Sequence, residues 1–440
     1  MTLKRLHAFA LSFLFLLQIS TAHAELSIQI TQGIDNPIPI AIVPFSWEGS
    51  GVLSEDVAEI VSSDLQQVGE FRALSPSNML AMPREEREVY YRDWSVLAQD
   101  YLLVGKVQRS PGSQLISVQY EFFDINREIK LAGEVLTGTE AQLRDIGHEI
   151  SNVVFELVTG NRGAFTTQIL YVVSDYVSPE LSYFRLEKAD YDGRRAQVLL
   201  ESREPIMSPS WSPNGLDIAY FFNDTATTHI YTQNIATGQR RQLTNYPNIN
   251  SSPVWSPDGT KLAMVLSKDG SPDIYVHDLL SNQLTRITDH PAIDTEPAWS
   301  RDGRSIVFMS DRTGQPQIYQ MEIGASSYEV ERLTYDCFQC AKGQFLPDGI
   351  NLVHVRRETR QSPQYQISIM NTETLRVISL TSTSLDESPS VAPNGSMIMY
   401  GTKYNGRGVL DAVSIDGRVK FRLPSSQGDV REPAWSPFLN

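Results

Sequence analysis

The chain has 440 residues, of which 41% are hydrophobic and 20% are charged, a composition that suits a globular protein with room for two or three domains. Its formal net charge of −15 argues against nucleic acid and anionic membrane surfaces as partners, because both would repel an acidic protein. Beyond the first 24 residues, no segment is long and apolar enough to span a bilayer.

The first 24 residues have the pattern of a secretory signal peptide. Lys4 and Arg5 form the positive start, residues 8–17 form an apolar run, and residues 22–24 (AHA) form a small-residue cleavage site. The alternative is a membrane-spanning helix, but a span needs about 20 apolar residues and this run is shorter. We therefore expect an exported mature chain that begins at Glu25, carries a net charge of −17 and has no cysteine at the cut for a lipid anchor.

The new N-terminus, residues 25–33 (ELSIQITQG), alternates apolar and polar residues, which indicates a β-strand. Because it lies at the extreme end of the mature chain, two interpretations remain open. It is either the first edge strand of a sheet in this protein or a free arm that adds to the sheet of another protein.

Residues 34–160 predict a compact α/β domain. Apolar strands are expected near residues 38–44, 71–74 and 101–104, and residues 115–123 and 129–136 alternate like the two strands of a hairpin. Ser54 is expected to cap a first helix that ends at Gly69. A short helix is expected near residues 91–97.

The last helix of this domain is predicted to begin with a capping box, Thr139-x-x-Gln142, and to stop at Gly160. Its apolar face follows the helical period. The residues expected to be buried are Leu143, Ile146, Ile150, Val153, Val154 and Leu157.

From residue 165 onward, one short motif recurs at a fixed spacing. It reads P-x-W-S-P-D/N-G, and its aromatic or apolar anchor stands at positions 211, 255, 299, 345, 391 and 435, at steps of 44 to 46 residues. The fourth and fifth copies carry Phe345 and Val391 in place of tryptophan. A fixed period in this range indicates a repeat architecture.

Each repeat predicts four strands, the number in one blade of a β-propeller. The Asp-Gly or Asn-Gly pair is expected to form a tight two-residue turn, and the anchor residue to pack between blades. The sixth copy, at Trp435, has no strands after it, whereas residues 168–174 form a second strand with no copy before it. We therefore expect residues 165–440 to form a six-bladed propeller with one blade closed by both ends of the domain.

The motifs of several enzyme classes are absent. There is no G-x-S-x-G elbow of a prolyl-oligopeptidase-type peptidase and no Walker loop, and His148-Glu149 lacks the second histidine of H-E-x-x-H. The histidines of the mature chain are scattered over different elements and are expected to be structural or surface residues: His148, His229, His277, His290 and His354. No enzymatic activity, cofactor or metal is expected.

Cys337 and Cys340 are the only cysteines, and their C-x-x-C spacing lies between two predicted strands. One pair cannot complete a four-ligand zinc site, and the redox motif would need the helix start of a thioredoxin-like unit. A local disulfide and two unreacted thiols both remain open. The acidic run at Asp190 and Asp192 is expected to be a turn, with bound calcium as the alternative.

One set of loops has constant length and variable content. Thr244, Thr288 and Thr334 each stand 11 residues before the next anchor, and the residues between them differ from repeat to repeat. These loops connect the last strand of one blade to the first strand of the next, so they share one face of the ring. A constant frame with variable loops is typical of a protein-binding surface.

Taken together, these features resemble the TolB family, the soluble periplasmic components of the Tol–Pal envelope system of Gram-negative bacteria. The resemblance covers essentially the whole chain. It rests on the exported start, the arm at 25–33, the segments 38–45 (IPIAIVPF) and 101–106 (YLLVGK), and the W-S-P-D-G repeats. It implies a non-enzymatic, monomeric adaptor that links inner-membrane TolA to the lipoprotein Pal and serves outer-membrane integrity and envelope constriction at cell division.

The resemblance also implies which residues bind each partner. The arm would bind TolA through Glu25, Leu26, Ser27, Ile28, Gln29, Ile30, Thr31, Gln32 and Gly33. One face of the propeller would bind Pal through Asn248, Ile249, Asn250, Asp294, Thr295 and Glu296, which match the family's Pal-contacting loops by position. The alternative function is a periplasmic propeller hydrolase or a glycan-binding lectin that uses the same face.

Overall fold

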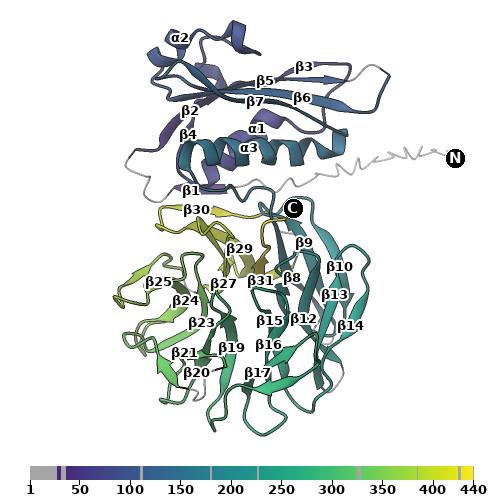
Figure 1. The fold of residues 1–440 in the computed structure, drawn as a ribbon, viewed down its shortest axis with the longest axis vertical. Coiled ribbons are helices and arrows are strands. Elements are labelled where there is room, and N and C mark those ends of the chain that lie inside the picture. The colour runs from purple at the N-terminus through teal and green to yellow at the C-terminus, as the bar shows by residue number, and fades with distance from the viewer. Residues whose placement is uncertain are drawn as a thin grey trace, which may run out of the picture.

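The computed structural model describes residues 27–30, 36–109, 112–178, 181–224, 227–324, 329–383, 385–424 and 428–439. A small α/β domain lies against a six-bladed β-propeller (Figure 1). The predicted signal segment, residues 1–24, lies outside the described residues, as do Glu25, Leu26 and residues 31–33. Among the described helices, none is long and apolar enough to cross a membrane.

The α/β domain contains one mixed sheet in which the strands follow the order β4-β2-β5-β6-β7, with β3 added beside β5. β2 runs parallel to β4 and β5, and β5, β6 and β7 form an antiparallel meander. The strands are β2 (Ile38–Ile42), β3 (Ser46–Glu48), β4 (Phe71–Ala73), β5 (Tyr101–Arg109), β6 (Ile116–Asp124) and β7 (Ile129–Gly138).

The helices of this domain cover both faces of the sheet. α1 (Val57–Gln67) and α3 (Leu143–Thr159) pack on the face toward the propeller, and α2 (Tyr91–Val96) packs on the other face (Figure 1). Three short 3₁₀ turns complete the domain: η1 (Pro76–Asn78), η2 (Glu86–Glu88) and η3 (Glu140–Gln142).

The first helix does not begin with the residue predicted from the sequence. Asp56, rather than Ser54, is the N-cap, because its Oδ1 accepts hydrogen bonds from the amides of Ala58 (2.9 Å) and Glu59 (3.2 Å). The capping box at Thr139 is present as predicted, and α3 ends at Gly160 in the left-handed conformation (φ 75°).

α3 is buried on more than the apolar face predicted from its sequence. Leu143, Ile146, Ile150 and Val154 are buried as expected, but Leu157 is 46% exposed and Val153 is partly exposed. On its other side, α3 buries polar residues against the propeller: Arg144, His148 and Ser151. α3 lies between the sheet of its own domain and the propeller, so both its apolar side and this polar side are buried.

The propeller consists of six sheets, as predicted. Four blades are each formed from consecutive strands: β11 (Ile206–Trp211), β12 (Asp217–Asp224), β13 (Thr227–Asn234) and β14 (Arg240–Gln242); β15 (Asn250–Trp255), β16 (Lys261–Leu266), β17 (Asp273–Asp278) and β18 (Leu284–Arg286); β19 (Asp294–Trp299), β20 (Ser305–Ser310), β21 (Gln317–Glu322) and β22 (Val330–Arg332); and β23 (Gln339–Phe345), β24 (Asn351–Arg357), β25 (Gln366–Asn371) and β26 (Val377–Ser379).

The other two sheets use the ends of the chain. β31 (Asp429–Trp435) pairs with β8 (Gln168–Ser178), which continues to β9 (Leu181–Asp190) and β10 (Gln197–Ser202), so this blade is closed by both ends of the domain as predicted. The last blade contains β27 (Glu387–Val391), β28 (Met397–Tyr404), β29 (Arg407–Ser414) and β30 (Val419–Arg422), to which β1 (Ser27–Ile30) adds a fifth strand.

The turn in the repeated motif is longer than predicted. In the second repeat, the amide of Ser256 donates to the carbonyl of Lys261 (2.9 Å), which closes a four-residue loop, and Gly259 alone has a positive φ (71°). Asp258 stabilises the loop by accepting from the Ser256 hydroxyl (2.6 Å) and the amide of Thr260 (3.0 Å). These bonds lower the pKa of Asp258 to about 2.

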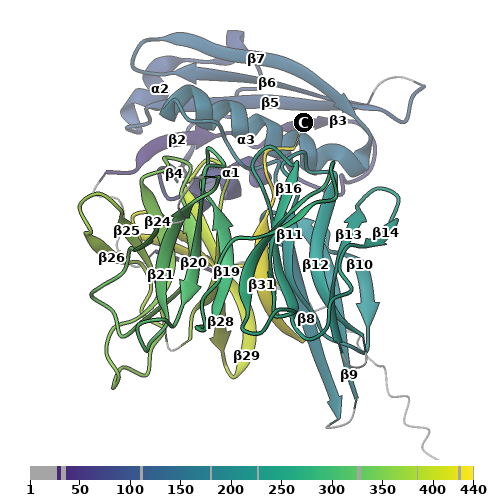
Figure 2. The same cartoon turned by 60° about the horizontal axis from the view of Figure 1, so that its bottom comes forward.

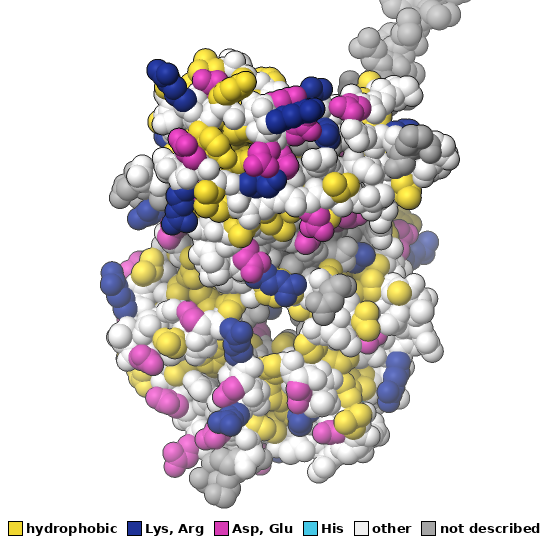
Figure 3. Space-filling view, turned by 45° about the horizontal axis from the view of Figure 1, so that its top comes forward, with side chains coloured by type: hydrophobic (Ala, Val, Ile, Leu, Met, Phe, Trp, Pro, Cys, Tyr) yellow, Lys and Arg dark blue, Asp and Glu magenta, His cyan; other side chains and the backbone are white. Residues whose placement is uncertain are grey.

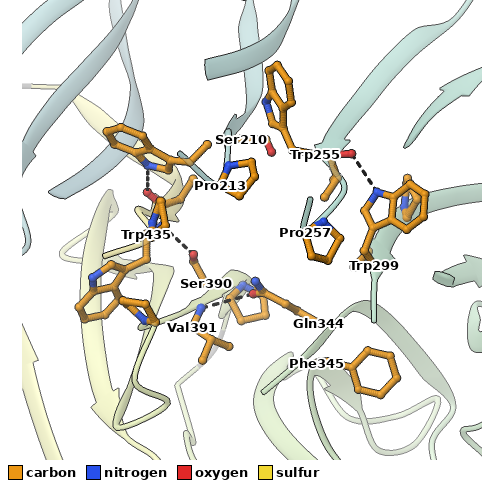
Figure 4. Close-up of a pocket in the computed structure, with 18 of the residues that line it drawn as sticks. Ser210, Pro213, Trp255, Pro257, Trp299, Gln344, Phe345, Ser390, Val391 and Trp435 are labelled. Carbon is orange, nitrogen blue, oxygen red and sulfur yellow. Dashed lines mark hydrogen bonds between the residues drawn. The ribbon is translucent and has the colours of Figure 1, made fainter. Parts of the chain in front are cut away.

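The anchor tryptophans pack between blades, as predicted. Trp211, Trp299 and Trp435 are each 8% exposed. The indole Nε1 of Trp299 donates to the carbonyl of Val254 in the preceding blade (3.1 Å), and Trp211 makes the equivalent bond to Ala434 (Figure 4). These bonds join neighbouring blades near the centre of the ring.

Candidate partner-binding surfaces

The N-terminal arm lies along the outer edge of the last blade, as an edge strand of this protein's own sheet. β1 runs antiparallel to β30, with Ser27 opposite Arg422 and Ile30 opposite Val419 (Figure 1). Pairing to a blade edge uses backbone hydrogen bonds, which any extended segment can make. The same segment could therefore exchange this edge for that of another protein.

The propeller has two faces. The loop face carries the connections between blades, such as residues 243–249 and 287–293, and the hairpins between second and third strands, such as residues 267–272 and 311–316. The turn face carries the W-S-P-D/N-G turns and lies beside the α/β domain, where Asn394 Nδ2 donates to the carbonyl of Arg162 (3.0 Å). In Figure 2 the β8–β9 hairpin extends away from the α/β domain, so the loop face lies on the far side of the propeller from that domain.

A repeated threonine fixes the start of each connection on the loop face. Its side-chain oxygen accepts a hydrogen bond from the first isoleucine amide of the third strand, at 2.9 to 3.0 Å. All four threonines are at most 3% exposed: Thr244, Thr288, Thr334 and Thr381. This device explains why these connections have nearly constant length.

The end of each connection is fixed by a second buried position, five residues before each anchor. Among the six repeats, every residue at this position is at most 1% exposed: Ile206, Asn250, Asp294, Cys340, Asp386 and Val430. Asn250 Nδ2 donates to the carbonyls of Tyr246 (2.8 Å) and Asn248 (3.3 Å). Asn250 and Asp294, predicted to bind a partner, therefore hold the loops in place and do not present their side chains to solvent.

The other predicted partner-binding residues are accessible. Asn248 and Ile249 form the exposed tip of one connection, and Asn248 has a positive φ of 68°. Thr295 is partly exposed in the neighbouring blade. The structure thus brings the two predicted loops together on adjacent blades of one face.

Glu296 lines the central channel. Its Oε2 accepts from the amide of Lys342 (2.9 Å) and its Oε1 lies 3.4 Å from Lys342 Nζ. Burial opposes the charge of Lys342, but the carboxylates of Glu296 and Glu432 outweigh it and raise the pKa of Lys342. At equivalent positions of the first strands, six residues have a positive φ at a β-bulge: Ser208, Ser252, Glu296, Lys342, Ser388 and Glu432.

The channel widens into a pocket of about 580 Å³ lined by the first strands of all six blades. Figure 3 shows the propeller hollowed at its centre, and in Figure 4 the rings of Trp255, Trp299 and Phe345 lie around the outside of the pocket. Half of the residues in the pocket wall are prolines and serines, and the charged residues Glu296, Lys342 and Glu432 also line it.

The loop face carries exposed apolar side chains, of which only Ile249 was predicted from the sequence to contact a partner. They lie at the tips of connections and hairpins or at the start of a first strand, and each is at least 40% exposed: Tyr176, Met207, Ile249, Ile293, Tyr335 and Tyr404. Solvent exposure of large apolar side chains on one face is typical of a protein-binding surface. Their strand-end positions are visible in the sequence only once the blade strands are assigned.

Cys337, in the connection between β22 and β23, forms a disulfide on the loop face with Cys340, near the start of β23. Of the two open alternatives, the structure therefore contains the local disulfide. Cys340 is 1% exposed, and Cys337 lies beside the exposed Tyr335 and Asp336. The disulfide fixes the shape of one loop of the candidate surface.

Ser151, His148 and Asp64 lie close together but are not arranged as a catalytic triad. Ser151 Oγ donates to Asp64 (2.6 Å) and not to His148, whose Nδ1 lies 2.8 Å from the same carboxylate. All three side chains are at most 2% exposed, so no substrate reaches the serine.

Comparisons with known proteins identify the family. A family model described as the TolB amino-terminal domain matches residues 26–131, and one described as the TolB beta propeller domain matches residues 155–439. The chain belongs to the TolB family. The resemblance inferred from the sequence is thus confirmed.

Relatives that match over nearly the full length of the chain are also TolB proteins. The chain is 48% identical over 421 residues to the Tol-Pal system protein TolB of Pseudomonas syringae pathovar tomato, covering 95% of this chain and 96% of the relative. It is 48% identical to that of Pseudomonas aeruginosa over the full length of both. The crystal structure of TolB from Acinetobacter baumannii aligns with a TM-score of 0.85 at 36% identity, covering 94% of this chain and 100% of that one. The protein is therefore a Tol–Pal system component.

Proposed function

We propose that this TolB-family protein is a non-enzymatic periplasmic adaptor that binds TolA through its N-terminal arm and Pal through the loop face of its propeller. Family membership supports a role in the Tol–Pal system. The observation that carries the assignment of surfaces is the loop face itself, where exposed apolar tips stand on buried polar anchors.

The arm suits a partner that offers a sheet edge. Among the described strands β1 pairs only with β30, at the margin of the last blade, so it can leave without separating the four strands of that blade. Residues 25–33 would then add to an edge strand of TolA by the same backbone hydrogen bonds. The signal-like segment before Glu25 supports export to the periplasm.

The loop face suits a folded protein. Ile249 and Ile293 are 42% and 45% exposed on neighbouring blades, and the loops that carry them are fixed by Asn250 and Asp294. Preorganised loops bind with little loss of conformational entropy. In this proposal, Asn248, Ile249, Thr295 and Glu296 contact Pal, and Asn250 and Asp294 position the loops.

Deletion of residues 25–33 distinguishes this adaptor from a propeller hydrolase or lectin. The purified mature chain and the deletion variant are tested for binding to the C-terminal domain of TolA and to Pal, and for hydrolysis or glycan binding. The adaptor predicts that the deletion abolishes TolA binding and retains Pal binding. TolA binding that survives the deletion, or glycan binding with no affinity for Pal, would refute it.

A further inference from the structure

The α/β domain contacts the propeller through a buried cluster of charged side chains. α1 contributes Asp64, α3 contributes Arg144 and His148, the end of β9 contributes Asp190, and the turn after β9 contributes Asp192. Each of these five side chains is at most 7% exposed. The cluster lies beside the apolar core that the two domains share.

Asp64 takes part in three hydrogen bonds, and the one from Tyr191 crosses from the propeller to the α/β domain. Its Oδ2 lies 2.8 Å from His148 Nδ1 and accepts from Ser151 Oγ (2.6 Å), and its Oδ1 accepts from the hydroxyl of Tyr191 in the propeller (2.7 Å). The Tyr191 hydroxyl also lies 3.2 Å from Gln67 Oε1. The other ring nitrogen of His148, Nε2, is buried with no hydrogen-bond partner among the described residues.

Two arginines bind the carboxylates of Asp190 and Asp192. Arg144 Nη2 donates to Asp192 Oδ2, and its Nε lies 3.3 Å from Asp190 Oδ2. Arg195 Nε donates to the same oxygen of Asp190 (2.7 Å). Other charged groups at this contact are less buried: the side chains of Glu55 and Asp145 are 36% and 51% exposed, and Lys188, on β9 beside Asp190, is partly exposed.

The buried carboxylates of this cluster outnumber its buried cations while His148 is neutral. Asp64, Asp190 and Asp192 contribute three negative charges, against one positive charge from buried Arg144, and Arg195, which binds Asp190, is 37% exposed. An uncompensated charge in a buried site is costly, and a protonated imidazole on His148 would reduce the excess of negative charge.

A bound metal ion suits the same site less well than a proton on His148 does. A ring nitrogen of His148 and one carboxylate oxygen each of Asp190 and Asp192 lie within 4.8 Å of one another, which is compatible with metal ligands. However, the guanidinium groups of Arg144 and Arg195 already bind both carboxylates. A divalent cation would have to compete with both guanidinium groups for these carboxylates.

We infer that protonated His148 is the group that closes this cluster, so that the α/β domain is held on the propeller by a pH-sensitive contact. The imidazolium donates to Asp64 from Nδ1 and presents Nε2–H to the negative charge of Asp192. When His148 loses its proton, the cluster has a net negative charge and the contact weakens.

The direction of the effect follows from the surroundings of His148. Burial disfavours the charged ring, but Asp64, by its charge and its hydrogen bond, together with Asp192, outweighs burial and the charge of Arg144 and raises the pKa of His148. A raised pKa in the closed state stabilises the contact fully below about pH 6.5, the ordinary value for histidine. That stabilisation is lost as the pH rises through the pKa of the closed state.

The first test is the titration of His148 in the mature chain with isotope-labelled histidine, followed by NMR and assigned with His148→Gln. We expect the His148 ring to titrate above the ordinary histidine value, with protons on both nitrogens at pH 6. A ring that is neutral at pH 6 would overturn the inference, whether or not the variant folds. The experiment is repeated with Zn²⁺, and displacement of the His148 proton by the metal would also overturn it.

The second test is hydrogen exchange of α1 and α3 between pH 6 and pH 9, corrected for the pH dependence of intrinsic exchange. The opening constant of the contact should rise about tenfold for each pKa unit that separates closed and open states. In His148→Gln it should not change with pH. His290→Gln, on the loop face, is the matched control and should behave as the wild type does. A pH-independent opening constant in the wild type would contradict the inference.

Discussion

Arg312 and Asp294 join two loops of the candidate Pal-binding face: Nη2 of Arg312 lies 3.2 and 3.0 Å from the two carboxylate oxygens of Asp294. Asp294 ends the connection into β19, and Arg312 lies in the hairpin between β20 and β21. Asp294 is fully buried and Arg312 is 15% exposed at its side chain. The pair therefore holds a connection and a hairpin of one blade in a fixed relation.

Arg312→Ala should destabilise the fold, because it leaves the carboxylate of Asp294 buried without its partner. We expect a loss of about 3 kcal/mol in the free energy of unfolding, measured by urea denaturation. Arg241→Ala, which changes an exposed arginine on β14, is the control and should have little effect. Equal denaturation midpoints for the two variants would show that the Arg312–Asp294 pair does not stabilise the loop.

Trp255 and Trp299, the anchors of the second and third repeats, differ in the hydrogen bonding of the indole Nε1. Trp299 donates from Nε1 to the carbonyl of Val254, whereas Nε1 of Trp255 is buried with no partner among the described residues. Trp299→Phe should therefore cost about 1 kcal/mol more than Trp255→Phe, since only the first change removes a hydrogen bond. Thermal melting of the two variants measures the difference, and equal losses would contradict the role of the bond between blades.

His354 should make the propeller less stable in acid. It is fully buried in β24, and burial lowers its pKa to about 4. The unfolded chain takes up a proton near pH 6.5 and the folded chain does not, so stability falls as the pH drops from about 6.5 toward 4, by up to about 3 kcal/mol. His354→Met should flatten this part of the curve of unfolding free energy against pH. A wild-type curve that is already flat over this range would refute the prediction.

The sequence predicted the propeller well because its signals are local and repeated. The spacing of the W-S-P-D/N-G motif set the number of blades, and the incomplete copies at Trp435 and at residues 168–174 showed which blade is split. Local detail was less certain. The two-residue turn was wrong because hydrogen bonds of Ser256 and Asp258 favour a longer loop.

The contacts between distant segments could not be predicted from the sequence. Arg144, His148 and Ser151 look like the solvent face of α3, and only the position of the propeller shows that they are buried. The same limit applies to the partner-binding loops. Their constant length was visible, but the burial of Asn250 and Asp294 depends on how the neighbouring strands pack.

The proposal that TolA and Pal bind to separate surfaces is tested most directly with a pair of variants. Each variant is titrated by calorimetry with Pal and with the C-terminal domain of TolA. One variant lacks residues 25–33, and the other carries Ile249→Asp and Ile293→Asp on the exposed tips of the loop face. We predict that the first variant loses binding to TolA and keeps binding to Pal, and that the second loses binding to Pal and keeps binding to TolA. Pal binding that is unaffected by the two aspartates, in a variant whose melting temperature is unchanged, would show that the loop face does not bind Pal.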